Sequence, residues 1–110
     1  MEDKTREAII FLKKMLGLQL LEIILNVDSR TINKWLKDEL HPSDRQEVTI
    51  RFTRNIIEIL LDYLTVVDTK DWLVTHSDYL YGIPAVEISR RPEEVRYAAL
   101  NRAARGEMYG

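Results

Sequence analysis

Cysteine is absent from the 110-residue chain, which excludes disulfide bonds and leaves only His41, His76 and carboxylates as candidate metal ligands. The two histidines stand in unrelated contexts, so we expect no metal site. Only four glycines occur, and they are too scattered to form a loop that cradles phosphates. His76, Ser77 and Asp78 include the residue types of a nucleophile and its base, but adjacent residues of a turn rarely face one another. We therefore expect neither an enzyme nor a bound cofactor.

Long hydrophobic runs are also missing. No apolar stretch approaches the ~20 residues that span a bilayer. The charged start, Met1-Glu2-Asp3-Lys4, is unlike a secretory signal. These features predict a cytoplasmic protein without membrane contact.

A strong net charge is the third absence. The chain carries a net charge of −2 at pH 7, too little for a protein that coats nucleic acid regardless of sequence, since such binding comes from many phosphate contacts. Residues 1–54 hold ten Lys and Arg against nine Asp and Glu, whereas residues 55–110 hold six against nine. Any DNA contact should therefore lie in the first half. Because a module so weakly charged would need two copies reading two half-sites, we expect a homodimer.

Residues 18–36 have the pattern of a short helix, a tight turn and a second helix. The apolar side chains of these helices can bury against one another only if the chain reverses at about Asn26. Asn tolerates the left-handed backbone of such a turn, and Asp28 can cap the second helix by accepting a hydrogen bond from the amide of Arg30 or Thr31. The apolar residues concerned are Leu21, Ile24, Leu25, Val27, Ile32 and Trp35.

The second of these helices leaves a polar and basic side facing outward. Hydrogen-bond donors and positive charge are what meet phosphates and base edges in a helix-turn-helix reader of DNA. A second interpretation is the ordinary exposed face of an amphipathic helix. The predicted DNA-binding residues are Ser29, Arg30, Asn33, Lys34 and Lys37.

Helical spacing of apolar residues continues throughout the chain, without the alternation typical of strands. The sequence predicts an all-α fold with a helix-turn-helix lobe (residues 1–42), a long central helix (43–67) and a small C-terminal helical lobe (68–110). In the first lobe a supporting helix over Thr5–Leu16 ends at Gly17.

The central helix should begin where Pro42 stops the preceding pattern and Ser43 forms a capping box with Gln46. It should continue from Asp44 to about Val67, with a stripe that includes Val48, Phe52, Ile56, Leu60 and Tyr63. The segment Asn55 to Val67 is apolar over most of its circumference, which favours a core shared by both lobes and leaves open a self-association surface.

Short elements follow. Asp68 or Thr69 should cap a helix through Val74, a turn should occupy residues 76–78, and a short helix should span Ala85–Ile88. Pro92 should open a last helix that Gly106 terminates.

The tail resembles the toxin-binding domain of the Xre/MbcA/ParS-like antitoxins, in which a helix-turn-helix half also comes first. The family pattern is a Trp-Leu pair, a Leu-Gly-Gly turn, a short helix of the form Pro-Leu-Glu-Leu, and a closing helix with a Leu-Leu pair and an Arg four residues before a Gly. The matching segments are Trp72-Leu73, Leu80 to Ile88, Val95, Ala99-Leu100, Arg102-Ala103 and Gly106.

Three departures from this pattern concern the partner surface. Tyr81 replaces one Gly, and only Ile83 stands before Pro84, so the turn should be one residue tighter. Ser89 takes the place of an apolar residue, and Ala99 replaces the first Leu of the pair.

The resemblance implies a type II antitoxin that neutralises a RES-type, NAD-degrading toxin and represses its own operon through operator DNA. It also implies occlusion, with the C-terminal end of the antitoxin at the mouth of the toxin's active site. An NAD pocket accepts phosphate and aromatic groups, which Glu107 and Tyr109 could imitate. The implied toxin-binding residues are Arg102, Arg105, Gly106, Glu107, Met108 and Tyr109. A stand-alone helix-turn-helix transcriptional regulator is the alternative, because it explains residues 18–37 equally well.

Overall fold

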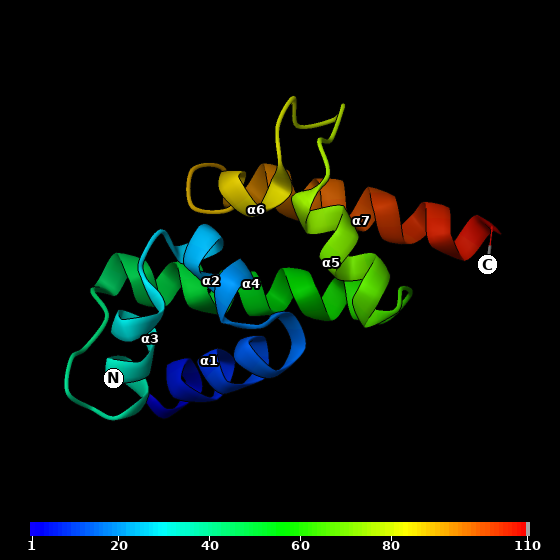
Figure 1. The fold of residues 1–110 in the computed structure, drawn as a ribbon. Helices are drawn as coiled ribbons and strands as arrows, with labels where there is room; N and C mark the ends of the chain where they lie inside the picture. The colour runs from blue at the N-terminus through cyan, green and yellow to red at the C-terminus, as the bar shows by residue number, and fades with distance from the viewer. Residues whose placement is uncertain (110) are drawn as a thin grey trace.

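The computed structural model describes the backbone of residues 1–109 and the side chains of residues 1–105. This part of the chain is all-α, with seven helices and no strand, which confirms the predicted fold class (Figure 1). Among the described helices, none combines the length and the hydrophobicity needed to cross a bilayer. The helices are α1 (Asp3–Leu16), α2 (Leu18–Leu25), α3 (Ser29–Leu36), α4 (Asp44–Leu61), α5 (Val66–Val74), α6 (Pro84–Glu87) and α7 (Pro92–Tyr109).

Helix α4 is the axis of the molecule. It packs against α1 and α7 and also contacts α2 and α5 (Figure 1). Ile56, Ile57 and Leu60 are fully buried in this packing, and each such side chain contributes about 1.5–3 kcal/mol of hydrophobic free energy. The interpretation of this segment as a shared core is therefore confirmed for these three residues, whereas Val66 and Val67 are exposed.

The long helix ends earlier than predicted. It stops at Leu61 rather than at about Val67, and Thr65 takes an extended conformation from which its side chain accepts a hydrogen bond from the amide of Asp68 at 3.1 Å. The predicted caps of α5, Asp68 and Thr69, were wrong. Threonine competes for backbone donors through its hydroxyl, and this local competition ends a helix without the Gly or Pro that would mark the break.

The start of α4 agrees with the prediction. Ser43 Oγ accepts a hydrogen bond from the Gln46 amide at 3.1 Å, and the Gln46 side chain accepts one from the Ser43 amide at 2.8 Å. Only Ile56 and Leu60 of the predicted apolar stripe are buried: Phe52 is half-buried, Val48 is 55% exposed and Tyr63 is 51% exposed. The buried residues of α4 are Ile50, Thr53, Ile56, Ile57 and Leu60, which recur every three or four positions along one side of the helix, so the buried stripe is offset from the predicted one at both ends.

The ends of other helices also differ from the prediction. Helix α1 begins at Asp3, before the predicted Thr5, and it ends as expected at Gly17, whose φ of 87° suits a residue without Cβ. Helix α6 begins at Pro84 instead of Ala85. Helix α7 begins at Pro92 as predicted but continues to Tyr109, so Gly106 does not terminate it. A glycine inside a helix costs about 1 kcal/mol, which a helix of this length tolerates.

Thr69→Val should raise the free energy of unfolding by about 1 kcal/mol, because the Thr69 hydroxyl is buried without a hydrogen-bond partner among the described residues. Thr53→Val is the matched control, since the buried Thr53 hydroxyl donates a hydrogen bond to the Thr49 carbonyl at 2.7 Å. Urea denaturation of both variants measures the difference. Equal losses of stability in the two variants would contradict the prediction.

Candidate nucleic-acid and partner interfaces

The turn between α2 and α3 has the predicted geometry. Asn26 is left-handed, with φ 54° and ψ 45°. Asp28 caps α3 by accepting hydrogen bonds from the Thr31 amide at 2.9 Å and from the Thr31 hydroxyl at 3.1 Å. These bonds hold the pKa of the Asp28 carboxyl below its ordinary value of 3.8. The cap therefore selects the second of the two predicted donors.

Contacts at both ends of α3 hold it in place. At its start, the Ser29 amide donates a hydrogen bond to Glu22 Oε1 of α2 at 2.8 Å. At its end, Arg6 of α1 donates to the Leu36 carbonyl at 2.6 Å and pairs with Asp38. Sequence reasoning missed both contacts, because neither partner lies within one helical turn of the residue it holds.

Burial of Ile32 and Trp35, at 0% and 2% exposure, determines which side of α3 faces outward. Of the predicted DNA-binding residues, Arg30, Lys34 and Lys37 are exposed, whereas Ser29 and Asn33 are half-buried. We call these five residues the α3 face. Among the described helices, α3 packs only against α1 and α2, so the α3 face is left open at the edge of the molecule (Figure 1).

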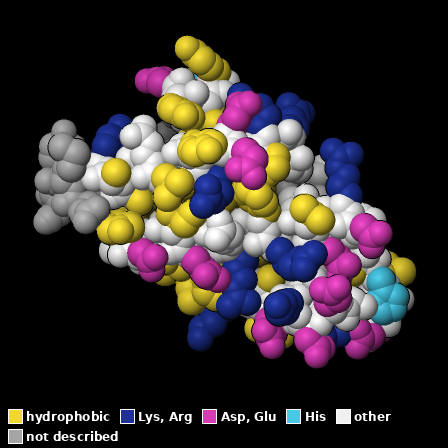
Figure 2. Space-filling view, turned by 180° about the vertical axis from the view of Figure 1, so that it is seen from behind, with side chains coloured by type: hydrophobic (Ala, Val, Ile, Leu, Met, Phe, Trp, Pro, Cys, Tyr) yellow, Lys and Arg dark blue, Asp and Glu magenta, His cyan; other side chains and the backbone are white. Residues whose placement is uncertain are grey.

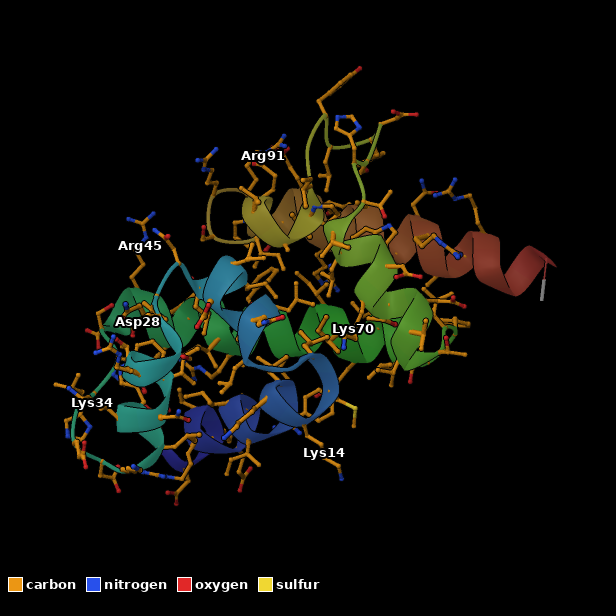
Figure 3. The ribbon with its side chains drawn as sticks, in the orientation of Figure 1. Lys14, Asp28, Lys34, Arg45, Lys70 and Arg91 are labelled. Carbon is orange, nitrogen blue, oxygen red and sulfur yellow. The ribbon has the colours of Figure 1, made fainter. Side chains whose placement is uncertain are left out.

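Positive charge on the α3 face is available to a partner. Within the part of the chain that the structure describes, Arg30, Lys34 and Lys37 form no ion pair. Arg45 adds a further cation that sequence reasoning missed. Figure 3 shows Lys34 and Arg45 at the same end of the molecule as Asp28, with Lys14 and Lys70 away from it.

A pocket of about 300 Å³ lies beside this end. It brings Arg45 together with Asn26 of the turn and with Ser89, one of the residues that departs from the antitoxin pattern. The other lining residues are Leu25, Gln46 and Thr49.

Arg102 and Arg105 line a second pocket, of about 320 Å³, which we call the arginine cleft. Its opposite wall comes from the end of α5 and the following loop: Trp72, Thr75, His76, Ser77, Asp78 and Tyr79, with Asn101 beside the arginines. His76 Nδ1 lies 3.7 Å from Asp78 Oδ1. The other implied toxin-binding residues, Gly106, Glu107, Met108 and Tyr109, lie outside the residues whose side chains are described.

The loop at residues 77–82 forms a small closed turn. The Ser77 amide donates to the Gly82 carbonyl at 2.8 Å, and the Gly82 amide donates to the Ser77 carbonyl at 3.3 Å. Leu80 is buried beneath the turn, at 1% exposure. Tyr81 has a φ of 54°, which places it in the left-handed region that favours glycine.

Arg91 joins this loop to α6 and α7. Its guanidinium donates hydrogen bonds to the Leu80 carbonyl at 2.5 Å, to Glu87 at 3.0 Å and to Glu94 at 2.6 Å, and the bond to Glu87 raises the pKa of Arg91. Glu87 also packs on Gly82, where an added Cβ would lie 3.2 Å from Glu87 Oε1. Sequence reasoning missed Arg91, although its spacing of four from Glu87 is a helical ion-pair signal.

Acid should weaken the capping of α3. A carboxyl whose pKa is lowered on folding contributes stability that is present above its ordinary pKa of 3.8 and is lost as the pH falls through the lowered value. Asp28→Asn keeps a capping oxygen but does not titrate. Denaturation at pH 7 and at pH 3 should show that the wild-type chain loses more stability than this variant. The same pH dependence in both would contradict the cap.

Lys34→Ala should weaken binding to the DNA upstream of the gene and reduce the slope of log affinity against log salt by about 1, as expected when one phosphate contact is lost. Lys14→Ala is the matched control, because Lys14 is also exposed but lies away from the α3 face (Figure 3). Fluorescence anisotropy across a salt series measures both quantities. Equal salt slopes for the two variants would exclude Lys34 from the interface.

Comparison with models of protein families, with curated proteins and with solved structures finds no match for this chain. The α3 face, the arginine cleft and the loop at residues 77–82 are therefore the features of the chain that bear on its function.

Proposed function

We propose that this chain is the antitoxin of a type II toxin–antitoxin system. In this proposal the C-terminal segment occludes the active site of a RES-type, NAD-degrading toxin, and the α3 face binds operator DNA. The observation that carries the proposal is Tyr81, which is left-handed at the position where the antitoxin pattern has a glycine. Glycine is the residue that adopts a positive φ most readily, so the backbone here is one that a glycine at this position would suit.

Neighbouring residues of the tail support the same interpretation. In the antitoxin pattern a leucine precedes the two glycines and a proline opens the short helix that follows. Here Leu80 is buried under the turn, Gly82 leaves room for Glu87, and Pro84 occupies the first turn of α6. Each of these residue types has a structural reason at its position, which supports the proposal.

The DNA-binding half of the proposal is supported by the open position of α3. A helix that reads the major groove must present several side chains on one side without hindrance from its own domain. The α3 face meets this requirement, since it carries three exposed cations and packs only on its inner side. We expect a homodimer, because so few cations give weak binding unless two half-sites are read together.

The geometry of α7 supports occlusion. Ala103 is 2% exposed and is the last buried residue among the described side chains, yet α7 continues to Tyr109. Figure 1 shows this end of α7 extending beyond α4 and α5. The C-terminal turns can therefore enter a partner's pocket without unfolding the core, and Arg102 and Arg105 stand at the base of this extension.

Co-expression with the protein encoded by the neighbouring reading frame tests the proposal. The neighbour alone should arrest growth and deplete cellular NAD, and the wild-type chain should reverse both effects. A chain that lacks residues 104–110 should keep its helical circular dichroism and its DNA affinity but lose the rescue, because the truncation follows the last described buried residue.

Lys34→Ala serves as the reciprocal control, since it should keep the rescue and weaken DNA binding. Rescue by the truncated chain would refute occlusion. A harmless neighbour, or a toxic one that the wild-type chain does not rescue, would refute the antitoxin function and favour the stand-alone regulator.

A further inference from the structure

Among the described residues other than glycine, three have a positive φ, and Tyr81 is the least expected of them. The other two are Asn26 and Asp38, and Asn and Asp tolerate the left-handed region because their short polar side chains bond locally. A tyrosine has no such compensation. The backbone of Tyr81 is therefore strained, and strain of this kind persists only where the surroundings enforce it.

The surroundings of Tyr81 enforce the conformation without using its side chain. The paired hydrogen bonds between Ser77 and Gly82 close the turn, and Arg91 holds the Leu80 carbonyl. The Tyr81 side chain is 88% exposed. A glycine would satisfy the turn with less strain, so the ring contributes nothing to the fold that offsets its backbone cost.

The ring stands at a place suited to contact with another protein. The loop projects from the packed helices (Figure 1), and hydrophobic side chains lie at its tip (Figure 2). Tyr79, on the same loop, is 57% exposed. Tyrosines in interfaces bury a large rigid surface at low entropic cost and recur among the residues that dominate binding energy.

The charge beside the loop indicates the chemistry of the partner. Tyr79 lines the arginine cleft with Arg102, Arg105 and His76, and among the lining residues whose side chains are described the only carboxylate is Asp78. Asp78 is already within 3.7 Å of His76. The cleft thus presents an excess of positive charge next to two exposed aromatic rings, which complements a surface that combines carboxylates with an apolar recess.

We propose that Tyr81, with Tyr79, is an aromatic anchor for a protein partner, whose apolar recess takes the ring of Tyr81 and whose carboxylates face Arg102 and Arg105. This inference rests on the proposed function, so the partner is the protein encoded by the neighbouring reading frame. The aromatic anchor is a second contact with the partner, in addition to occlusion by the C-terminal segment. It lies in the loop at residues 77–82 rather than on α7, and it makes recognition specific.

Calorimetric titration of the purified neighbour with the full-length chain tests the anchor. Tyr81→Gly should weaken the affinity about thirtyfold or more, the loss typical of a residue that dominates an interface. The thermal midpoint of the same variant alone should not fall, because glycine relieves the positive φ. Tyr81→Phe should keep the affinity within about threefold, since the ring is preserved.

Ile10→Ala is the control for loss of an exposed apolar side chain. Ile10 is 52% exposed and lies on α1, which among the described residues contacts neither α6 nor α7, the two helices that Arg91 joins to the loop. This variant should therefore bind like the wild-type chain. Wild-type affinity in Tyr81→Gly would overturn the anchor while leaving the antitoxin function standing. A lower thermal midpoint in Tyr81→Gly would show that the ring serves the fold, which also overturns the anchor. Absence of any complex with the wild-type chain would overturn the proposed function and this inference together.

Discussion

Ile56, Ile57 and Leu60 of α4 are fully removed from water between helices from the two halves of the chain. Because α1 and α7 pack on the same helix, neither half has a complete core alone. The molecule measures 45 × 24 × 20 Å, and α4 runs along its length (Figure 1). This shared core therefore holds the α3 face and the loop at residues 77–82 as parts of one body, and substitutions in it should affect both.

The shared core sets the approximate positions of α3 and of the loop at residues 77–82, and polar contacts fix them more closely. Glu22 and Arg6 hold α3 at its two ends, and Arg91 holds the loop against α6 and α7. Each contact satisfies a backbone group that no helix ladder satisfies, which is where a hydrogen bond matters most for a unique geometry. The basic α3 face and the arginine cleft are thus held by different contacts and belong to different helices and loops. In our proposal this separation allows DNA and a protein partner to be bound by separate surfaces.

Sequence reasoning succeeded where the cause is local. The caps at Asp28 and Ser43 depend on residues three positions ahead, and the left-handed turn at Asn26 depends on the residue itself. It failed where the cause is tertiary or unmarked. No Gly or Pro marks the break before Thr65, and the residue type of Tyr81 does not by itself indicate a positive φ. The hydrogen bond from Arg91 to the Leu80 carbonyl beside it also joins residues that are distant in sequence. The same distinction holds for the candidate sites. The exposed cations of α3 could be predicted from helical periodicity, whereas the arginine cleft could not, because its walls come from elements that only the fold brings together.

Hydrogen–deuterium exchange of the chain, measured with the upstream DNA and separately with the protein encoded by the neighbouring reading frame, tests most directly the claim that two surfaces serve two partners. We expect DNA to slow exchange over residues 29–37 alone, and the protein partner to slow it over residues 77–82 and the C-terminal turns of α7. Two results would contradict the claim of two separate surfaces: protection of the same segments by both partners, or no protection of the expected segments by either partner.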